Sequence, residues 1–466
     1  MKNASLPLIS CVLTVFDEGE IARVSIDSVL AQRYGNFELV IVEDGASKET
    51  RAVLDDYDDG RIVRIRQSND GLSSARNRGI THARGKYLCF LDADDLRPQW
   101  AFQTLADAIE ATGADCILSP GMLVERKNDI VPFYDTPVFD AVVRKYSPPY
   151  AAVEGEPDFW EFLACLSLLE PQVANKCVKR DLIMDWNIRF PNGLYFEDFL
   201  LQAGLLAHVE SIAVTTWPTF TYFQRYGRPQ ITSTSDMRRF DVISVAHIAL
   251  DAFARTPRFA KRRVRAGFLV SVFRLVFWCE SEISHFWREQ FAASVDYLIR
   301  NLDPDYFEGL DNPDVLVLLE NLTDGEAVLA EIRHRLRRIA RNYGPDNVPA
   351  HGGMPASAQD TNDRVWVVAN LNQLIRKRQK RWRIGKRHFE PLDLDAPWER
   401  ILEVADAVKT AIPIPEDFDD KEYIEQNADV ARACSEGRFR SGYEHYIRHG
   451  RTEKRHRTQA RYRPSD

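Results

Sequence analysis

The chain has 466 residues, 45% of them hydrophobic, and a formal net charge of −8. Its length exceeds one ordinary hydrophobic core, so we expect two or three domains, and its composition excludes a disordered chain. The negative charge gives no reason to expect nucleic acid as a partner. Seven cysteines are scattered without a C-x-x-C pair, which argues against a zinc site or a disulfide framework and favours a reducing compartment.

Two apolar stretches could be mistaken for membrane or export signals. Residues 6–16 are followed by no small-residue cleavage pattern and end in Asp17-Glu18-Gly19-Glu20, so they predict a first strand. Residues 264–279 contain Arg265 and Arg274 and are too short to span a bilayer, so they predict a buried helix. We therefore expect a cytoplasmic protein, with peripheral association at the inner face of the membrane left open.

The first 120 residues alternate short apolar runs with helical patterns. Alternation at this spacing predicts a parallel α/β sheet with helices on both faces. The strands that we expect are 8–15, 37–43, 62–66, 87–91 and 115–118. The helices that we expect are 19–32, 48–56, 72–83 and 99–111.

Polar or small residues follow the first, second and fourth of these strands. They are Asp17-Glu18-Gly19, Glu43-Asp44-Gly45-Ala46-Ser47 and Asp92-Ala93-Asp94-Asp95. Because the carboxyl ends of parallel strands meet at one edge of a sheet, these junctions should converge on a ligand site. The carboxylates of the third junction could hold Mg²⁺ or Mn²⁺ against a diphosphate. The alternative is that they only cap the next helix.

The rest of the chain divides by composition. A mixed pattern, with a helix expected at 157–168 and strands near 209–216 and 219–224, becomes helical after residue 237. Gly, Pro and small polar residues then mark a linker. The predicted parts are an α/β domain at 1–237, a helical domain at 238–342, the linker at 343–363, a basic helical segment at 364–416 and a small helical module at 417–466.

Two helical stretches in this half have a marked charge pattern. Residues 331–341 place Ile332, Leu336 and Ile339 on one face and arginines on the other. Residues 376–387 are rich in Lys and Arg, which ordinarily means a solvated helix face. The sharper alternative is that this basic stretch binds an anionic polymer, a lipid headgroup or a protein partner.

Five ordered segments of residues 7–237 resemble the family 2 glycosyltransferases, which are nucleotide-sugar-dependent enzymes of the GT-A fold. The segments are Val12–Glu18, Phe37–Ser47, Asn69–Gly79, Gly85–Asp95 and Phe190–Asp198. The resemblance implies a GT-A-type, Rossmann-like and mostly parallel sheet, followed here by a mainly helical C-terminal half. It also implies a nucleotide-sugar donor, with a UDP-sugar as first choice, and inversion at the anomeric carbon.

The resemblance assigns donor-side roles to the ends of the first two strands. Thr14, Phe16 and Glu18 would line the nucleotide, and Phe16 would offer a ring face to a uracil-like base. Asp44 would accept hydrogen bonds from the base or the ribose. The family often has Tyr at position 16 and Asp-Asp-Gly-Ser where this chain has Glu43-Asp44-Gly45-Ala46, and core packing is the alternative for Phe16.

The middle segments supply a guanidinium and a metal site by the same resemblance. Arg76 would reach the nucleotide, since a guanidinium suits phosphate oxygens, and Arg78 would point elsewhere. Asp92 and Asp94 match the family's DxD motif for Mn²⁺ or Mg²⁺. Asp94 is the first choice as metal ligand, Asp92 would contact the ribose or support the metal, and Asp95 would cap the next helix.

Glu197 and Asp198 match the acidic pair on the family's acceptor side. Sugar transfer needs a base that takes the proton from an acceptor hydroxyl. The match puts Asp198 first for this role, with Glu197 as second choice or as a group that positions the acceptor. Without the other segments, an acidic pair before a helix would be only a cap. Further on, Arg225 and Arg228 would close over the diphosphate as a mobile flap.

Two other features have less certain roles by sequence. Lys176 occupies a position where relatives often show a similar lysine, and a salt bridge is an equal candidate. Residues 418–455 resemble a small helical module at the ends of many bacterial glycan-assembly enzymes. His445 and His449 are spaced to share a metal, but no third ligand is evident, so we expect packing. The module would dock a partner, an acceptor chain or another subunit.

Together these assignments predict a metal-dependent inverting glycosyltransferase acting on a glycan or lipid-linked acceptor in bacterial surface polysaccharide synthesis. One alternative is a sugar nucleotidyltransferase, which would usually show a Gly-rich loop and a basic residue after the first strand. Residues 17–20 form no such loop. The other alternative is a non-catalytic member of the fold that binds glycans or partners.

Overall fold

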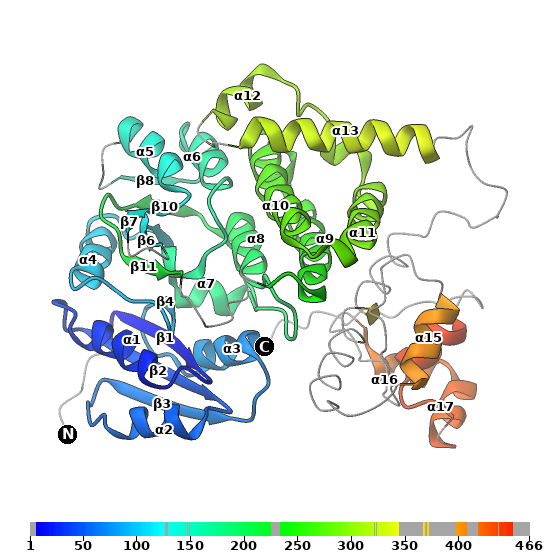
Figure 1. Cartoon of the computed structure of the whole chain (residues 1–466), viewed down its shortest axis with the longest axis horizontal. Helices are drawn as coiled ribbons and strands as arrows, with labels where there is room; N and C mark the ends of the chain where they lie inside the picture. Colours follow the sequence, from blue (N-terminus) through cyan, green and yellow to red (C-terminus); the bar gives the residue numbers. More distant parts are fainter. Residues whose placement is uncertain are drawn as a thin grey trace. The chain divides into compact units, whose positions relative to one another are not determined.

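The computed structural model describes residues 6–125, 129–146, 148, 150–224, 234–320, 322, 324–343, 367–368, 371, 398–407, 418–436 and 438–450. The chain divides into two compact units (Figure 1). The first unit comprises Met1–Ser284 and Leu302–Arg338, and the second comprises His285–Asn301 and Ile339–Asp466.

An eight-stranded sheet forms the centre of the first unit, with the order β3-β2-β1-β4-β9-β5-β10-β8. Its strands are β1 Ile9–Val15, β2 Phe37–Asp44, β3 Ile62–Gln67, β4 Tyr87–Asp92, β5 Cys116–Leu118, β8 Ala151–Val153, β9 Lys176–Lys179 and β10 Ser211–Val214. Neighbours from β3 to β4 are parallel, and so are β5 and β10, which confirms the mostly parallel sheet. Strands β8 and β9 run antiparallel and were not predicted, because three or four residues are too short for a periodic signal.

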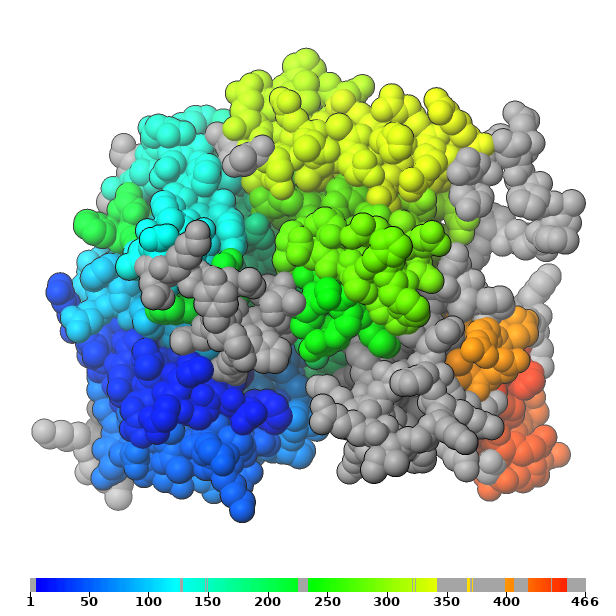
Figure 2. Space-filling model, viewed as in Figure 1, coloured from blue at the N-terminus to red at the C-terminus, as the bar shows by residue number. Residues whose placement is uncertain are grey.

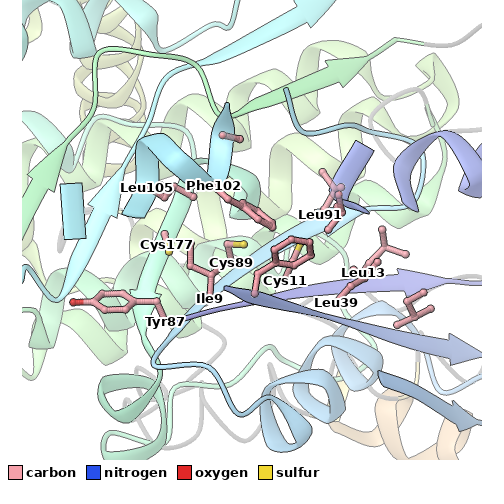
Figure 3. Packing of buried hydrophobic residues seen from close by; sticks show 14 of the residues in the cluster. Ile9, Cys11, Leu13, Leu39, Tyr87, Cys89, Leu91, Phe102, Leu105 and Cys177 are labelled. Carbon is pink, nitrogen blue, oxygen red and sulfur yellow. The ribbon is translucent and has the colours of Figure 1, made fainter. Parts of the chain in front are cut away.

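Helices cover the sheet as the alternating pattern predicted. They are α1 Glu20–Leu30, α2 Lys48–Asp55, α3 Leu72–His82 and α4 Ala101–Thr112. Every residue of β1 and β2 is buried, as expected for strands covered on both faces. Figure 3 shows part of this core, where Cys11 of β1 and Cys89 of β4 lie near Phe102 of α4.

A second sheet, with the order β11-β6-β7, joins the first unit. Its strands are β11 Phe220–Phe223, β6 Gly121–Val124 and β7 Ile130–Pro132. The predicted strand at 219–224 is therefore β11, outside the central sheet. The helices around this region are α5 Thr136–Lys145, α6 Phe159–Leu166, η1 Val173–Asn175, α7 Arg180–Asp185 and α8 Asp198–His208.

The compact unit continues past residue 237 through η3 Met237–Phe240, α9 Asp241–Ala254, η4 Pro257–Ala260, α10 Arg262–Glu282, η6 Pro304–Phe307 and α12 Pro313–Leu319. Helix α9 packs on α8 and α10 on α6. A Cβ at Gly267 of α10 would lie 2.0 Å from Ser167 Oγ, so these helices approach closely. In Figure 2 the yellow-green surface of α12 lies against the cyan surface near α6. Whether residues 1–237 fold alone stays a prediction.

Two sequence predictions concern these later helices. The apolar residues 264–279 lie within α10 and line its buried side, which confirms the buried helix. Helix α13 spans Gly325–Tyr343, and Ile332 is fully buried in it. The arginines do not all lie on its exposed face, because Arg335 is buried and donates to Glu280 Oε2 at 2.7 Å. The pairing with an acid on α10 makes that burial tolerable.

The second unit contains η5 His285–Trp287, α11 Arg288–Asn301, α15 Trp398–Ala407, α16 Asp420–Gln426, α17 Ala428–Ser435, α18 Gly442–His445 and the π-helical turn η7 Tyr446–Gly450. In its last part, rings of Phe418, Tyr423 and Tyr443 pack together, and His445 Nδ1 lies 3.3 Å from Tyr423 Oη. His445 is thus a packing residue, as expected. Almost all of the linker, and the basic stretch 376–387, lie outside the described residues.

No helix in the described ranges combines the length and the apolar character that crossing a membrane requires. All seven cysteines are free, in agreement with the prediction of no disulfide framework.

We predict that Gly79→Ala destabilises the first unit although alanine is the better helix former by about 1 kcal/mol. A Cβ at Gly79 would lie 2.3 Å from Val12 Cγ1 of β1, so α3 would have to shift off the sheet. Urea unfolding should show a loss of about 1–3 kcal/mol. Gly60→Ala, which meets nothing within 4 Å, is the control. Stabilisation by Gly79→Ala would contradict the close approach.

Candidate active site

The carboxyl ends of β1, β2 and β4 converge at one edge of the sheet, as the three junctions predicted. Thr14 pairs in register with Asp92, and Val15 with Glu43. The Phe16 side chain is 46% exposed, which excludes core packing as its role. Its backbone N–H donates to Glu18 Oε2 at 2.5 Å, so Glu18 shapes the turn that presents the ring.

Asp44 is buried and holds the loop before α3. Its Oδ1 accepts hydrogen bonds from Gln67 Nε2 and from the Asp70 N–H, both at 2.8 Å, and its Oδ2 accepts from the Gly71 N–H at 2.9 Å. The neighbouring Glu43 is paired with arginines of β3 instead. The structure therefore assigns Asp44 a loop-forming role, and its contact with a nucleotide stays a prediction.

Arg76 is buried at the centre of the site and contacts three carboxylates. Its Nη2 donates to Asp92 Oδ1 at 2.7 Å, and its Nη1 donates to Asp198 Oδ1 at 2.7 Å and to Glu197 Oε1 at 2.5 Å. This one guanidinium therefore joins the end of β4 to the start of α8. Burial alone would lower the pKa of Arg76, but the charges of the three acids outweigh burial and raise that pKa.

The two acids at the start of α8, Glu197 and Asp198, also have raised pKa values. Burial, and then the charge of Asp198, raise the pKa of Glu197 against the effect of Arg76. Burial also raises the pKa of Asp198, with Arg76 opposing and Asp92 adding to the shift. One arginine cannot neutralise three carboxylates, so the site holds excess negative charge.

The loop that carries these acids is tied to α3 and to α9. Asn77 clamps the backbone of Phe190, with its Nδ2 donating to the carbonyl at 2.9 Å and its Oδ1 accepting the N–H at 3.0 Å. The Tyr195 N–H donates to Asp241 Oδ2 at 3.0 Å. Phe196, just before Glu197, has a φ of +66°, which is strained for a non-glycine residue. The acids are thus delivered by a constrained turn.

The helix-cap explanations fail for both acidic clusters. Glu197 precedes α8 but makes no side-chain cap hydrogen bond; it and Asp198 face Arg76. The prediction that Asp95 caps the next helix is wrong, because α4 begins only at Ala101, beyond an irregular segment containing a proline. Asp95 is buried, and its Oδ1 accepts from the Phe223 N–H at 3.1 Å.

Two buried cations, Arg97 and Lys176, form hydrogen bonds near the candidate site. Arg97, which the sequence analysis did not single out, donates from Nη1 to the carbonyls of Ala174 and Thr219, both at 2.9 Å. The only sequence signal for Arg97 is its position just after Asp94 and Asp95. Lys176 donates to Asn175 Oδ1 at 2.6 Å and to a backbone carbonyl rather than to a carboxylate. Burial lowers the pKa of Lys176 to about 8.

The remaining predicted residues concern the metal and the flap. Asp92 and Asp94 are both partly exposed at the end of β4, and their hard oxygens suit Mg²⁺ or Mn²⁺. The described residues include no group of three acidic, His or Cys side chains placed to hold a metal ion. A pair of carboxylates still fits such an ion, because Mg²⁺ is commonly held by one or two carboxylates together with substrate phosphates. Arg225 and Arg228 lie outside the described residues. Arg78 is exposed, in line with its pointing elsewhere.

Comparison with known proteins agrees with this arrangement. Residues 10–148 match the family model described as glycosyl transferase family 2. Residues 10–148 are therefore similar to a family 2 glycosyltransferase domain. An uncharacterized glycosyltransferase, EpsJ of Bacillus subtilis, is 37% identical over 114 residues, which are 24% of this chain and 33% of that protein. The glycosyltransferase GlyG of Streptococcus pneumoniae is 25% identical over 273 residues, which are 58% of this chain and 85% of that protein.

Two further comparisons set the extent of the likeness. Uncharacterized glycosyltransferase RP339 of Rickettsia prowazekii is 38% identical over 95 residues, so the chain spans about a third of the length of this relative and of EpsJ. The crystal structure of S. aureus TarS 1-349 in complex with UDP-GlcNAc has a TM-score of 0.53 and 16% identity, covering 74% of this chain and 98% of that one. This likeness confirms the predicted fold class, a GT-A-type sheet followed by a helical region.

We predict that Arg76→Ala lowers the free energy of unfolding by about 3–5 kcal/mol at pH 7, because three neighbouring acids lose their shared cation. The loss should shrink on acidification, since Glu197 and Asp198, whose pKa values are already raised, become neutral in the folded state. Urea unfolding at pH 7 and pH 5 checks both points. Arg78→Ala removes an exposed arginine two residues along and is the control. Equal effects of the two substitutions would contradict the account.

Proposed function

We propose that this chain is a metal-dependent inverting glycosyltransferase. It moves a sugar from a nucleotide-sugar, with a UDP-sugar as first choice, to a hydroxyl of a glycan or lipid-linked acceptor. One observation carries the proposal: the Arg76 guanidinium lies 2.7 Å from both Asp92, on the donor side, and Asp198, on the acceptor side. A donor held at Asp92 would therefore have its anomeric carbon near the acid that accepts a proton. TarS, a protein of the same fold, has been solved with UDP-GlcNAc and with UDP, which supports a uridine donor.

Asp198 is the proposed base. Transfer in one displacement requires the acceptor hydroxyl to lose its proton as it attacks, and a carboxylate of raised pKa is well matched to accept it. The side chain of Asp198 is 22% exposed whereas that of Glu197 is 5% exposed, so Asp198 is the acid that an acceptor can reach. Glu197, held on Arg76, orients the pair.

On the donor side, the exposed ring of Phe16 would stack on the base, while Thr14, Glu18 and Asp44 shape the floor beneath it. Asp94, with Asp92, would hold Mg²⁺ or Mn²⁺, and when bound this ion neutralises charge on the departing diphosphate. The hydrogen bond from Arg76 Nη2 to Asp92 Oδ1 would hold the Asp92 carboxylate in position for this ion.

The flap and the partners complete the proposal. Arg225 and Arg228 would contact the diphosphate. The acceptor would belong to a bacterial surface polysaccharide. The basic stretch 376–387 and the C-terminal module would provide contacts to a membrane surface or a protein partner, and catalysis would take place in the cytoplasm. The flap, the acceptor class and the role of the module are supported by the sequence resemblance, and the role of the basic stretch is supported by its charge.

We predict that Asp198→Asn loses transfer by about 10²- to 10⁴-fold, because an amide cannot take the acceptor proton. Binding of UDP, measured by calorimetry, should stay within a factor of two, roughly the scatter of an unperturbed site. Asp181→Asn, an exposed acid on α7, is the matched control and should change neither quantity. Near-normal transfer by Asp198→Asn would move the base to Glu197 or elsewhere.

We predict that Asp94→Ala abolishes metal-stimulated donor turnover and weakens Mn²⁺ binding in the presence of UDP, because one of two protein ligands is lost. Calorimetric titration with Mn²⁺ measures the binding separately from turnover. Asp58→Ala removes an exposed acid elsewhere in the same unit and serves as the control. Full turnover in EDTA would rule out the metal assignment.

A further inference from the structure

A cavity of about 550 Å³ lies outside the site described above, between α4 and the segment that follows β10. Residues along its wall include Arg33, Trp100, Thr104, Asp107 and Trp217. Its size falls within the range of small-molecule sites, and its wall mixes aromatic faces with a few polar groups, which is the usual composition of such sites. We call it the Trp217 groove.

Two indoles give the Trp217 groove its shape. Trp217 is 64% exposed, although its ring is one of the largest apolar surfaces in the chain. Trp100 is fixed by a hydrogen bond from its Nε1 to the Pro218 carbonyl at 3.0 Å. The two rings lie 6.4 Å apart at 68°. At that angle they cannot sandwich a flat base between parallel faces, but each can pack against the C–H face of a puckered sugar ring.

The polar groups of the groove suit hydroxyls rather than a charged polymer. Arg33 and Asp107 both line it, and Asp107 Oδ1 accepts a hydrogen bond from Gln103 Nε2 at 2.7 Å. Their opposite charges cancel, so the groove offers no net attraction to a polyanion or a polycation. A guanidinium only donates, a carboxylate only accepts, and the hydroxyl of Thr104 does either, which together match a neutral sugar.

Two segments of the groove wall are connected to the candidate active site along the chain or through Arg97. Trp100 follows Asp94 by six residues, so their Cα atoms lie within roughly 22 Å of each other. Between them, Arg97 donates to the carbonyl and hydroxyl of Thr219, on the same segment as Trp217. A chain molecule that occupies the groove would thus lie on the segments that position the donor-side acids.

We propose that the Trp217 groove binds a neutral glycan, as a subsite for a part of the acceptor chain away from the reacting end. That this glycan is the acceptor rests on the proposed function. The binding of a neutral oligosaccharide to the groove does not.

Calorimetry and saturation-transfer NMR with chitotetraose, cellotetraose and maltotetraose on the full chain test the proposal. At least one of these neutral oligosaccharides should bind, and Trp217→Ala should weaken its binding at least about tenfold, the loss of one stacking face. Trp186→Ala is the matched control, because it also removes an exposed indole, one that stacks on His208 at 3.9 Å outside the groove. It should leave the affinity unchanged.

A second variant separates hydrogen bonding from stacking. Asp107→Asn keeps the shape of the groove. It should weaken the binding of the same oligosaccharide less than Trp217→Ala does. The proposal is overturned if none of the three sugars binds, if Trp217→Ala binds like Trp186→Ala, or if only a sulfated heparin tetrasaccharide binds. Donor hydrolysis by the unaltered chain is measured in parallel. Its absence would contradict the proposed function and leave the groove assignment standing.

Discussion

The site depends on one buried guanidinium that three carboxylates share. A buried arginine is tolerated only when acids surround it, and acids this buried are tolerated only when a cation is near. Arg76 meets both conditions through residues that are up to 122 positions away in the chain. The arrangement forces α3, the end of β4 and the start of α8 to be correctly placed at the same time. The contacts that build the candidate site therefore also constrain the fold.

The packing around Arg76 fixes the positions of this side chain and of the acids that it contacts. Gly79, one turn along the same buried face of α3, lets the helix lie directly on Val12 of β1. Asn77 holds the opposing loop through the backbone of Phe190, and Phe190 packs edge to face on Phe90 at 5.5 Å. Acids on a loop that is fixed by helices and strands can be positioned far more tightly than acids on a free loop.

Much of this fold could be predicted from local patterns. Strands β1 and β2 are fully buried and β4 is buried up to Leu91; their apolar runs end in or before acids that mark the sheet edge where a site forms. The short antiparallel β9 has no such pattern, and its insertion between β4 and β5 depends on tertiary contacts. The pairing of Arg76 with Glu197 and Asp198 and the contact of Asp95 with Phe223 could not be predicted, because contacts across more than a hundred residues have no local signature. The resemblance assigns Arg76 to the nucleotide, which stays a prediction, and the structure adds its contacts with three carboxylates.

The raised pKa of Asp198 links this geometry most directly to catalysis. If Asp198 accepts the acceptor proton, the transfer rate should fall on acidification through the pKa of that buried carboxyl, above the ordinary aspartate value of about 3.9. The positive charge of Lys176 lowers the pKa of Asp198, so Lys176→Met should move this acid limb to higher pH. The most direct measurement is the pH dependence of kcat/KM for both proteins. The account predicts a limb above the range of an ordinary aspartate that shifts upward in Lys176→Met, and a limb at the same pH in both proteins would contradict it.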